Sequence, residues 1–177
     1  MKTKKIAITG GPATGKSSIV EHLVSKGFDC MKEVSRGLTL KAQKEGVDQL
    51  FLKDPLWFSE QLLELRVKQF NEAHQSLSNL VFFDRGLIDI VAYLDYINCE
   101  YSNKFKLECK KNRYDKVFIL NPWKAIYTQD NERYETFKQS TEIHKFLVKW
   151  YNYFDYKLIE VPQLSVEERV AFILENS

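Results

Sequence analysis

Short apolar runs and amphipathic segments alternate along the chain. The apolar runs are bounded by polar or glycine-rich turns and predict five buried strands, at residues 5–9, 28–32, 80–83, 116–120 and 157–161. Strands that are apolar throughout belong to sheets buried on both faces, and helices between them favour parallel pairing. The pattern therefore predicts an α/β fold with a five-stranded parallel sheet between two helical layers. In such sheets, ligands bind beyond the carboxyl ends of the strands.

Helical periodicity fills the segments between the predicted strands. The predicted helices begin near residue 17 and cover 34–45, 55–77, 87–97, 104–112 and 143–154, with a last helix after residue 165. Capping residues support three of the boundaries. Gly27 is placed for a left-handed C-cap, and Asp54 precedes a proline in a first turn. Ser165 and Glu168 have the spacing of a capping box.

A glycine-rich segment joins the first predicted strand to the first helix. Residues 10–17 fit G-x-x-x-x-G-K-[ST], the phosphate-binding loop of P-loop NTPases. An ordinary surface turn would explain the glycines, but not the Lys-Ser pair at the start of a helix. The predicted nucleotide-binding residues are Gly10, Gly11, Pro12, Ala13, Thr14, Gly15, Lys16, Ser17 and Ser18.

The residue types of this loop suit a nucleoside triphosphate. Small residues let backbone N–H groups approach the phosphates, and the helix N-terminus adds a partial positive charge. We expect Lys16 to reach the β- and γ-phosphates. The hydroxyl of Ser17 is expected to join the coordination shell of Mg²⁺.

Two charged residues stop the third apolar run. Asp84 ends a buried strand, where a Walker-B-type carboxylate approaches the magnesium ion, although it would also suit the N-cap of the next helix. Arg85 offers a planar fork of donors for phosphate oxygens, and a surface ion pair is the alternative.

Glu33 follows the second predicted strand, on the side where a phosphoryl acceptor would lie. A carboxylate at this position can take the proton of an attacking hydroxyl, or it can simply favour the start of the next helix. Arg36, further along, is either a contact for an anionic part of the acceptor or a solvent-facing side chain.

A polar stretch at 124–137 is poor in core residues. It is typical of a mobile lid that would deliver Arg133 to the transferring phosphoryl group, and a plain solvated loop is the alternative. Trp57, Phe58, Tyr93 and Tyr96 either line an aromatic pocket for a base or belong to the core.

Composition narrows the function classes. With 177 residues, of which 44% are hydrophobic, we expect one domain over residues 1–177. The 26 basic and 24 acidic residues nearly balance, which argues against a general nucleic-acid or membrane-surface binder. Cys30, Cys99 and Cys109 match no zinc spacing and are typical of a reduced, cytoplasmic protein. No apolar run approaches the length of a membrane span.

Nearly the whole chain resembles a small AAA-like P-loop family that includes nicotinamide-riboside-kinase-type domains. The matching segments are 8–12, 15–17, 33–36, 82–86, 130–133 and 161–170. The chain is also similar to deoxynucleoside and nucleoside-monophosphate kinases, in which an acidic residue followed by Arg ends the third strand. The resemblance implies the strand order 2-3-1-4-5, a helical lid and an adenine contact near Pro162. Riboside-kinase-type domains end this strand in Asp-Thr-Asp rather than Asp84-Arg85-Gly86, so the resemblance supports ATP more strongly than any one acceptor.

These features together predict a Mg²⁺-dependent ATP phosphotransferase for a small metabolite, namely a nucleoside, a nucleotide or nicotinamide riboside. The predicted catalytic residues are Lys16, Glu33, Asp84, Arg85 and Arg133, and the predicted metal ligands are Ser17 and Asp84. The alternative is an ATP- or GTP-hydrolysing switch without a small-molecule acceptor, although the sequence has no N-K-x-D guanine signature. We expect a monomer or a homodimer.

Overall fold

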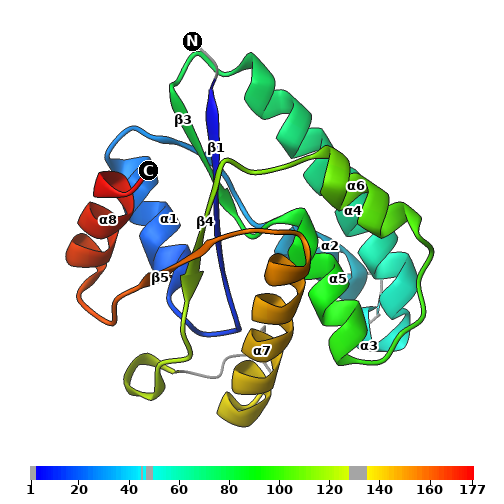
Figure 1. The fold of residues 1–177 in the computed structure, drawn as a ribbon. Coiled ribbons are helices and arrows are strands. Elements are labelled where there is room, and N and C mark those ends of the chain that lie inside the picture. Colours follow the sequence, from blue (N-terminus) through cyan, green and yellow to red (C-terminus); the bar gives the residue numbers. More distant parts are fainter. Residues whose placement is uncertain (1–2, 45, 47–49, 128–134) are drawn as a thin grey trace.

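A five-stranded parallel sheet forms the centre of the molecule (Figure 1). The computed structural model describes residues 3–44, 46, 50–127 and 135–177. The strands are β1 (Lys4–Gly10), β2 (Asp29–Met31), β3 (Leu80–Asp84), β4 (Lys116–Leu120) and β5 (Leu158–Val161), in the order β2-β3-β1-β4-β5. The predicted fold class and strand order are therefore confirmed. The register of β1 and β3 pairs Ile8 with Asp84, so the end of β3 lies beside the start of the glycine-rich loop.

Helices connect the strands. They are α1 (Lys16–Ser25), α2 (Ser35–Lys44), α3 (Leu50–Lys53), α4 (Pro55–Glu72), α5 (Leu87–Tyr96), α6 (Lys104–Lys111), α7 (Phe137–Tyr153) and α8 (Val166–Glu175), with the short 3₁₀ turns η1 (Ala73–Gln75) and η2 (Lys124–Ile126). The periodicity did not predict α3, because a single turn is too short to show a helical pattern. Elsewhere each predicted helix is present, with some ends shifted. No helix in the described ranges has the length and apolarity to cross a membrane.

The prediction of one helix from 55 to 77 was wrong at its end. The α-helix stops at Glu72, and η1 leads into an extended Ser76. The backbone N–H of Ser78 donates to the hydroxyl of Ser76 over 3.0 Å, and both serine hydroxyls donate to Asp29, at 2.6 and 2.7 Å. Because these local hydrogen bonds compete with helical ones, the serines end the helix.

The three predicted capping features are confirmed. The carboxylate of Asp54 accepts a hydrogen bond from the backbone N–H of Trp57 over 3.1 Å, at the start of α4. Ser165 and Glu168 form the capping box that opens α8. Gly27 adopts a φ of 85° just past α1, a left-handed conformation that glycine adopts at little cost.

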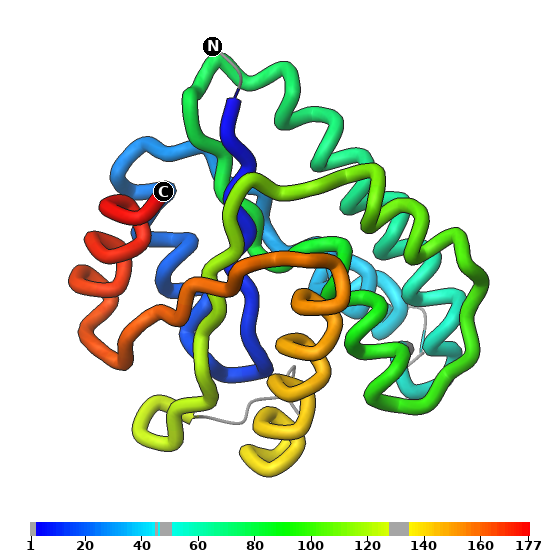
Figure 2. The backbone as a smooth tube through the Cα atoms, viewed as in Figure 1, coloured from blue at the N-terminus to red at the C-terminus, as the bar shows by residue number. Residues whose placement is uncertain are grey.

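Alternating strand residues build two apolar clusters, one on each face of the sheet. Ile6 and Ile8 pack toward α1 and α8, which lie side by side and contact each other. Ala7, between them in sequence, packs toward α4, α5 and α7 on the other face. Figure 2 shows the same arrangement along the backbone, with α8 beside α1 and α7 across the sheet. Both faces of the sheet are therefore buried, and the polar residues of a site are expected at the edge where the strands end.

Candidate active site

The glycine-rich loop turns sharply at the carboxyl end of β1. Gly15 has a φ of 88° and is the N-cap of α1, so Lys16 is the first helical residue. A Cβ atom at Gly10 would lie 2.7 Å from the carbonyl oxygen of Leu120, and one at Gly11 would lie 2.7 Å from the hydroxyl oxygen of Ser140. Close backbone approach therefore explains the first two glycines, and the left-handed turn explains the third.

Lys16 folds back onto the loop. Its ammonium group donates to the carbonyl oxygens of Gly10 and Gly11 over 2.8 and 2.6 Å, and to the Thr14 hydroxyl over 3.2 Å. Burial, with a further contribution from the positive charge of Arg85, lowers the pKa of Lys16 to about 7. A polyphosphate would offer this lysine charged oxygens in place of neutral ones, which favours its protonated form.

Glu33 is held between two arginines. Its Oε1 atom accepts from Arg66 and from the backbone N–H of Ser35, each at 3.0 Å. Its Oε2 atom lies 2.5 Å from Nε of Arg85, in an ion pair whose angle is poor for a hydrogen bond. Burial alone would raise the pKa of Glu33, but the two arginines and the Ser35 amide outweigh it and lower the pKa to about 2. The residue is thus both a helix-start contact and a buried, ionised group of the site.

Arg66 was missed as a functional residue. It lies on the buried face of α4 and is 4% exposed. Its Nη1 atom donates to the carbonyl oxygen of Gly86 over 2.8 Å while Nη2 holds Glu33. A sequence signal could have identified it. Arg66 lies four positions from both Leu62 and Phe70, which places a charged side chain on the apolar face of a helix.

Arg85 bridges Glu33 and the glycine-rich loop. Its Nη1 atom donates to the carbonyl oxygen of Gly10 over 3.2 Å, and its guanidinium lies 5.4 Å from the ring centroid of Tyr93. Its backbone has a φ of 72°, which is rare for a residue other than glycine. Because its side chain is 15% exposed, the surface-ion-pair alternative is wrong.

Asp84 ends β3 and is 8% exposed. The N-cap of α5 is Gly86, so the alternative role of Asp84 as an N-cap is wrong. Burial raises its pKa, while the nearby Lys16 opposes that change. Within the described residues no hydrogen bond reaches the Asp84 carboxylate, which leaves its oxygens open to a cation.

Two side chains of the cavity lining carry oxygens that suit Mg²⁺. Asp84 and Ser17 line the same cavity, and carboxylate and hydroxyl oxygens are ligands that Mg²⁺ accepts. The guanidinium of Arg36 donates to the Ser17 hydroxyl oxygen over 3.3 Å. No cluster of three or more His, Cys, Asp or Glu residues in the described chain could hold a metal alone. A magnesium ion here would therefore depend on nucleotide oxygens for its remaining ligands.

One cavity of about 430 Å³ joins these groups. Residues 12–18 line it together with Glu33, Asp84 and Arg85, whereas Gly10 and Gly11 lie beneath the lining. Six apolar or aromatic residues also line it, and the Phe51 ring contacts the rings of two of them, Phe58 and Tyr93; the six are Leu40, Phe51, Phe58, Leu62, Ile90 and Tyr93. Of the four aromatic residues considered for a base-binding pocket, Phe58 and Tyr93 line the cavity, and their role toward a base stays a prediction. Trp57 is 46% exposed outside the cavity, and Tyr96 packs its ring 5.7 Å from that of Phe146.

The cavity also extends past the loop toward α8. Its lining there includes Ile126, Val166 and Arg169, while Pro162, the predicted adenine contact, does not line it. Arg169 is 5% exposed, donates to the carbonyl oxygen of Thr14 over 3.4 Å and lies 5.6 Å from the Trp123 ring. The adenine role of Pro162 stays a prediction, and Arg169 is a lining residue that sequence reasoning missed.

Arg133 and the central part of the predicted lid, residues 128–134, lie outside the described residues. The segments that flank this stretch are described. Before it, η2 places Ile126 at the cavity, and after it the hydroxyl of Ser140 in α7 donates to the carbonyl oxygen of Pro12 over 2.8 Å. The helix that follows the predicted lid is thus hydrogen-bonded directly to the phosphate-binding loop.

Comparisons with known proteins agree with this geometry. A family model described as an AAA domain matches residues 5–169. The fold is similar to that of a deoxyadenosine kinase from M. mycoides, with a TM-score of 0.70, 20% identity and 97% of each chain covered. It is also similar to a thymidylate kinase from Candida albicans, with a TM-score of 0.68, 16% identity and coverage of 99% of this chain and 91% of that one.

A third similar structure is the NadR protein in complex with NR. The TM-score is 0.72 and the identity 16%, over 98% of this chain and 49% of NadR. A search of curated proteins found no match. At these identities the likeness establishes the P-loop kinase fold and not the acceptor. Because the family match runs from β1 into α8, the chain belongs to the AAA domain family.

Proposed function

We propose that this protein transfers the γ-phosphoryl group of ATP to a hydroxyl group of a small, nucleoside-like metabolite, with Mg²⁺. One observation carries the proposal: the phosphate-binding loop and an ionised Glu33 line the same cavity, whose lining also includes apolar and aromatic side chains. The fold is shared with kinases that are named for deoxyadenosine and thymidylate, which supports the reaction class.

The donor end follows from the loop. The backbone N–H groups of the loop and Lys16 bind the β- and γ-phosphates. Ser17 and Asp84 hold the magnesium ion, which neutralises phosphate charge and orients the phosphates when it is bound. Arg85 lies between the loop and Glu33, where it would stabilise charge on the transferring group.

The acceptor end favours a hydroxyl over a phosphate. A phosphate acceptor is already ionised at neutral pH and needs a cation, whereas a hydroxyl has a proton to lose and needs an acceptor for it. Arg66 is engaged by Glu33, Arg36 donates to the Ser17 hydroxyl oxygen, and the Glu33 carboxylate would repel an incoming phosphate. Glu33 therefore suits a hydroxyl group.

The chemical step balances without a further reactant. The acceptor oxygen forms a bond to the γ-phosphorus, the bond from phosphorus to the β–γ bridging oxygen breaks, and ADP leaves. The hydroxyl proton passes to a carboxylate oxygen of Glu33. A carboxylate with a pKa of about 2 is a weak base, but the loose transition state of phosphoryl transfer asks more for orientation of the hydroxyl than for early proton removal.

The test is a phosphoryl-transfer assay with ATP and Mg²⁺. The panel pairs deoxyadenosine, deoxycytidine, thymidine and nicotinamide riboside with their 5′-monophosphates, and Lys16→Ala is the inactive control. We expect transfer to at least one nucleoside and none to its monophosphate. Phosphorylation of a monophosphate alone would contradict the hydroxyl assignment. ATP hydrolysis that no acceptor accelerates would favour the nucleotide-hydrolysing switch instead.

A further inference from the structure

Asp89, one turn into α5, is an acid that the sequence did not single out. It is 1% exposed and belongs to the cavity wall behind Arg85. Its Oδ1 atom accepts from the Thr9 hydroxyl over 2.7 Å and from Nη1 of Arg85 over 3.4 Å. Its Oδ2 atom accepts from the backbone N–H of Gly86 over 3.0 Å and from the Tyr151 hydroxyl over 2.7 Å.

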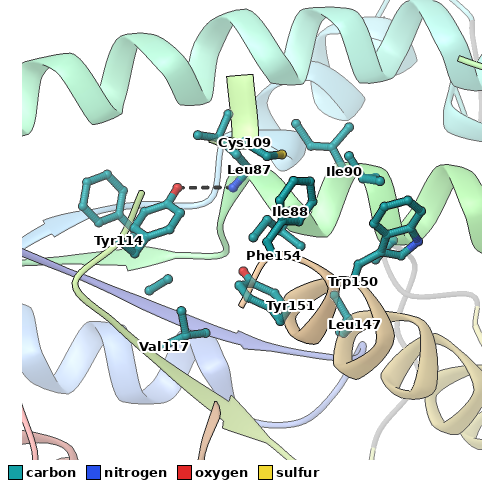
Figure 3. Close-up of a cluster of buried hydrophobic side chains, with 14 of the residues drawn as sticks. Leu87, Ile88, Ile90, Cys109, Tyr114, Val117, Leu147, Trp150, Tyr151 and Phe154 are labelled. Carbon is teal, nitrogen blue, oxygen red and sulfur yellow. Dashed lines mark hydrogen bonds between the residues drawn. The ribbon is translucent and has the colours of Figure 1, made fainter. Parts of the chain in front are cut away.

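These four donors come from different parts of the fold. Thr9 belongs to β1, Arg85 and Gly86 to the turn after β3, and Tyr151 to α7. Figure 3 shows the Tyr151 ring within the apolar cluster between α5 and α7, near Leu147 and Ile88. Because its ring is enclosed, the Tyr151 hydroxyl has little freedom, and it supplies one of the four hydrogen bonds that hold the Asp89 carboxylate.

Charge gives Asp89 a second role. The charged residues of the cavity wall include Lys16, Arg66 and Arg85 together with the carboxylates of Glu33, Asp84 and Asp89. Glu33 is shared by two guanidinium groups, so it compensates only one of their two charges. Asp89 lies 3.4 Å from Arg85 and supplies the second negative charge.

The backbone of Arg85 also needs support. A non-glycine residue at a φ of 72° keeps that conformation only when its surroundings hold it. The Arg85 N–H donates to the carbonyl oxygen of Ile8 over 3.0 Å, and Asp89 holds both the next N–H, that of Gly86, and the Arg85 guanidinium. One carboxylate thus constrains both the turn and the side chain that the turn presents.

We infer that Asp89 is a positioning residue, which fixes Arg85 between Glu33 and the phosphate-binding loop and so sets the geometry of transfer. The inference rests on the proposed function, in which Arg85 stabilises charge on the transferring phosphoryl group. The effect of Asp89 on transfer passes through Arg85.

Asp89→Asn is the informative substitution. With its oxygen toward Gly86 and Tyr151, the amide keeps those two hydrogen bonds, and its NH₂ group can donate to the Thr9 hydroxyl oxygen. That same NH₂ group then faces Nη1 of Arg85, so two donors meet and the contact is lost. Tyr151→Phe is the matched control, because it removes one hydrogen bond from Asp89 but leaves the charge beside Arg85.

We expect Asp89→Asn to lower kcat by about tenfold to a hundredfold, the range seen when a partner that orients a site residue is removed at metal centres. ATP affinity should stay near the wild-type value. Tyr151→Phe should lower thermal stability with little change in kcat. In an Arg85→Ala background, Asp89→Asn should have no further effect on kcat, because the residue through which it acts is gone.

Three results would overturn the inference: equal loss of kcat in Asp89→Asn and Tyr151→Phe, additive effects with Arg85→Ala, or unchanged kcat in folded Asp89→Asn. If Asp89→Asn does not fold, Asp89→Glu keeps the charge but displaces the carboxylate, and wild-type kcat in that variant would refute positioning. If the wild type transfers to no acceptor, the proposed function fails by itself. The Arg85 Nε–H nuclear magnetic resonance signal, assigned with Arg85→Lys, then decides: a shifted or broadened signal in Asp89→Asn supports positioning, and an unchanged one overturns it.

Discussion

Glu33→Gln is the substitution whose effect on stability follows most directly from the structure. The carboxylate is 10% exposed, with Arg66 on one oxygen and Arg85 on the other. Glutamine keeps the shape and can still accept from Arg66 or Ser35. However, it removes the negative charge that two buried guanidinium groups share. Breaking a buried ion pair from one side is destabilising, because the charge that remains is desolvated and uncompensated.

The magnitude follows from the pKa of Glu33. The value in the folded protein, about 2, lies below the ordinary 4.5, so the carboxylate stabilises the fold above about pH 4.5 and loses this effect as the pH falls through 2. One pKa unit corresponds to about 1.4 kcal/mol, so the full contribution at neutral pH is about 3 kcal/mol. By the same linkage relation, about half of it remains at pH 3.

Urea unfolding of the wild type and of Glu33→Gln, between pH 7 and pH 3, measures the difference in their free energies of unfolding. We expect Glu33→Gln to lower the free energy of unfolding by about 3 kcal/mol at pH 7, with the gap narrowing as the pH approaches 3. Glu142→Gln is the control, because it removes an exposed carboxylate 2.8 Å from Lys145 and should change stability by less than about 1 kcal/mol. The reasoning would be refuted if Glu33→Gln and the wild type had the same free energy of unfolding at pH 7. It would also be refuted if the difference between them did not change with pH.

Three further predictions concern catalysis. Lys16→Ala should severely reduce triphosphate affinity or turnover in a folded protein, because the Lys16 ammonium group donates its hydrogen bonds to oxygens of its own loop and not to the core. Calorimetric titration with ATP and a thermal melt check this, and wild-type ATP binding would contradict the nucleotide site. Asp84→Asn should impair both phosphoryl transfer and slow ATP hydrolysis by water, since each reaction needs Mg²⁺. Glu33→Gln should lower transfer by about 10²- to 10⁴-fold and leave hydrolysis unchanged. Parallel assays with and without acceptor compare the two variants, and equal losses of hydrolysis would argue against Glu33 as the base. Arg133→Ala should lower kcat more than ATP affinity if this arginine stabilises charge that develops only during transfer. Steady-state kinetics and ATP titration measure kcat and affinity separately. An effect on affinity alone would mean that Arg133 contacts ATP in the ground state.

The nucleotide end of the site could be predicted from the sequence because its determinants are local. The loop motif, the strand before it and the helix after it occupy one continuous stretch, and Gly15 and Lys16 have the roles in the fold that their spacing indicates. Asp84 and Glu33 were found for a related reason. Asp84 ends β3 and Glu33 lies two residues past the end of β2, and parallel strands end at the same edge of the sheet.

The proposed acceptor end of the site depends on contacts that no local pattern contains. Arg66 reaches Glu33 across 33 positions, and the Tyr151 hydroxyl reaches Asp89 across 62. Arg66 and Asp89 are charged residues on the buried faces of α4 and α5, and the sequence pattern does not say which charges will face them.

The sequence by itself therefore determined the order of strands and helices along the chain, the glycine-rich loop and the edge of the sheet where the cavity lies. Hydrophobic periodicity and turn chemistry act over a few residues, so they can be read directly from the chain. Only the tertiary structure decided that Glu33 is clamped by two arginines and that Asp89 stands behind Arg85. A buried charge is stable only with a partner, and the packing of α4, α5 and α7 determines which partners come within reach.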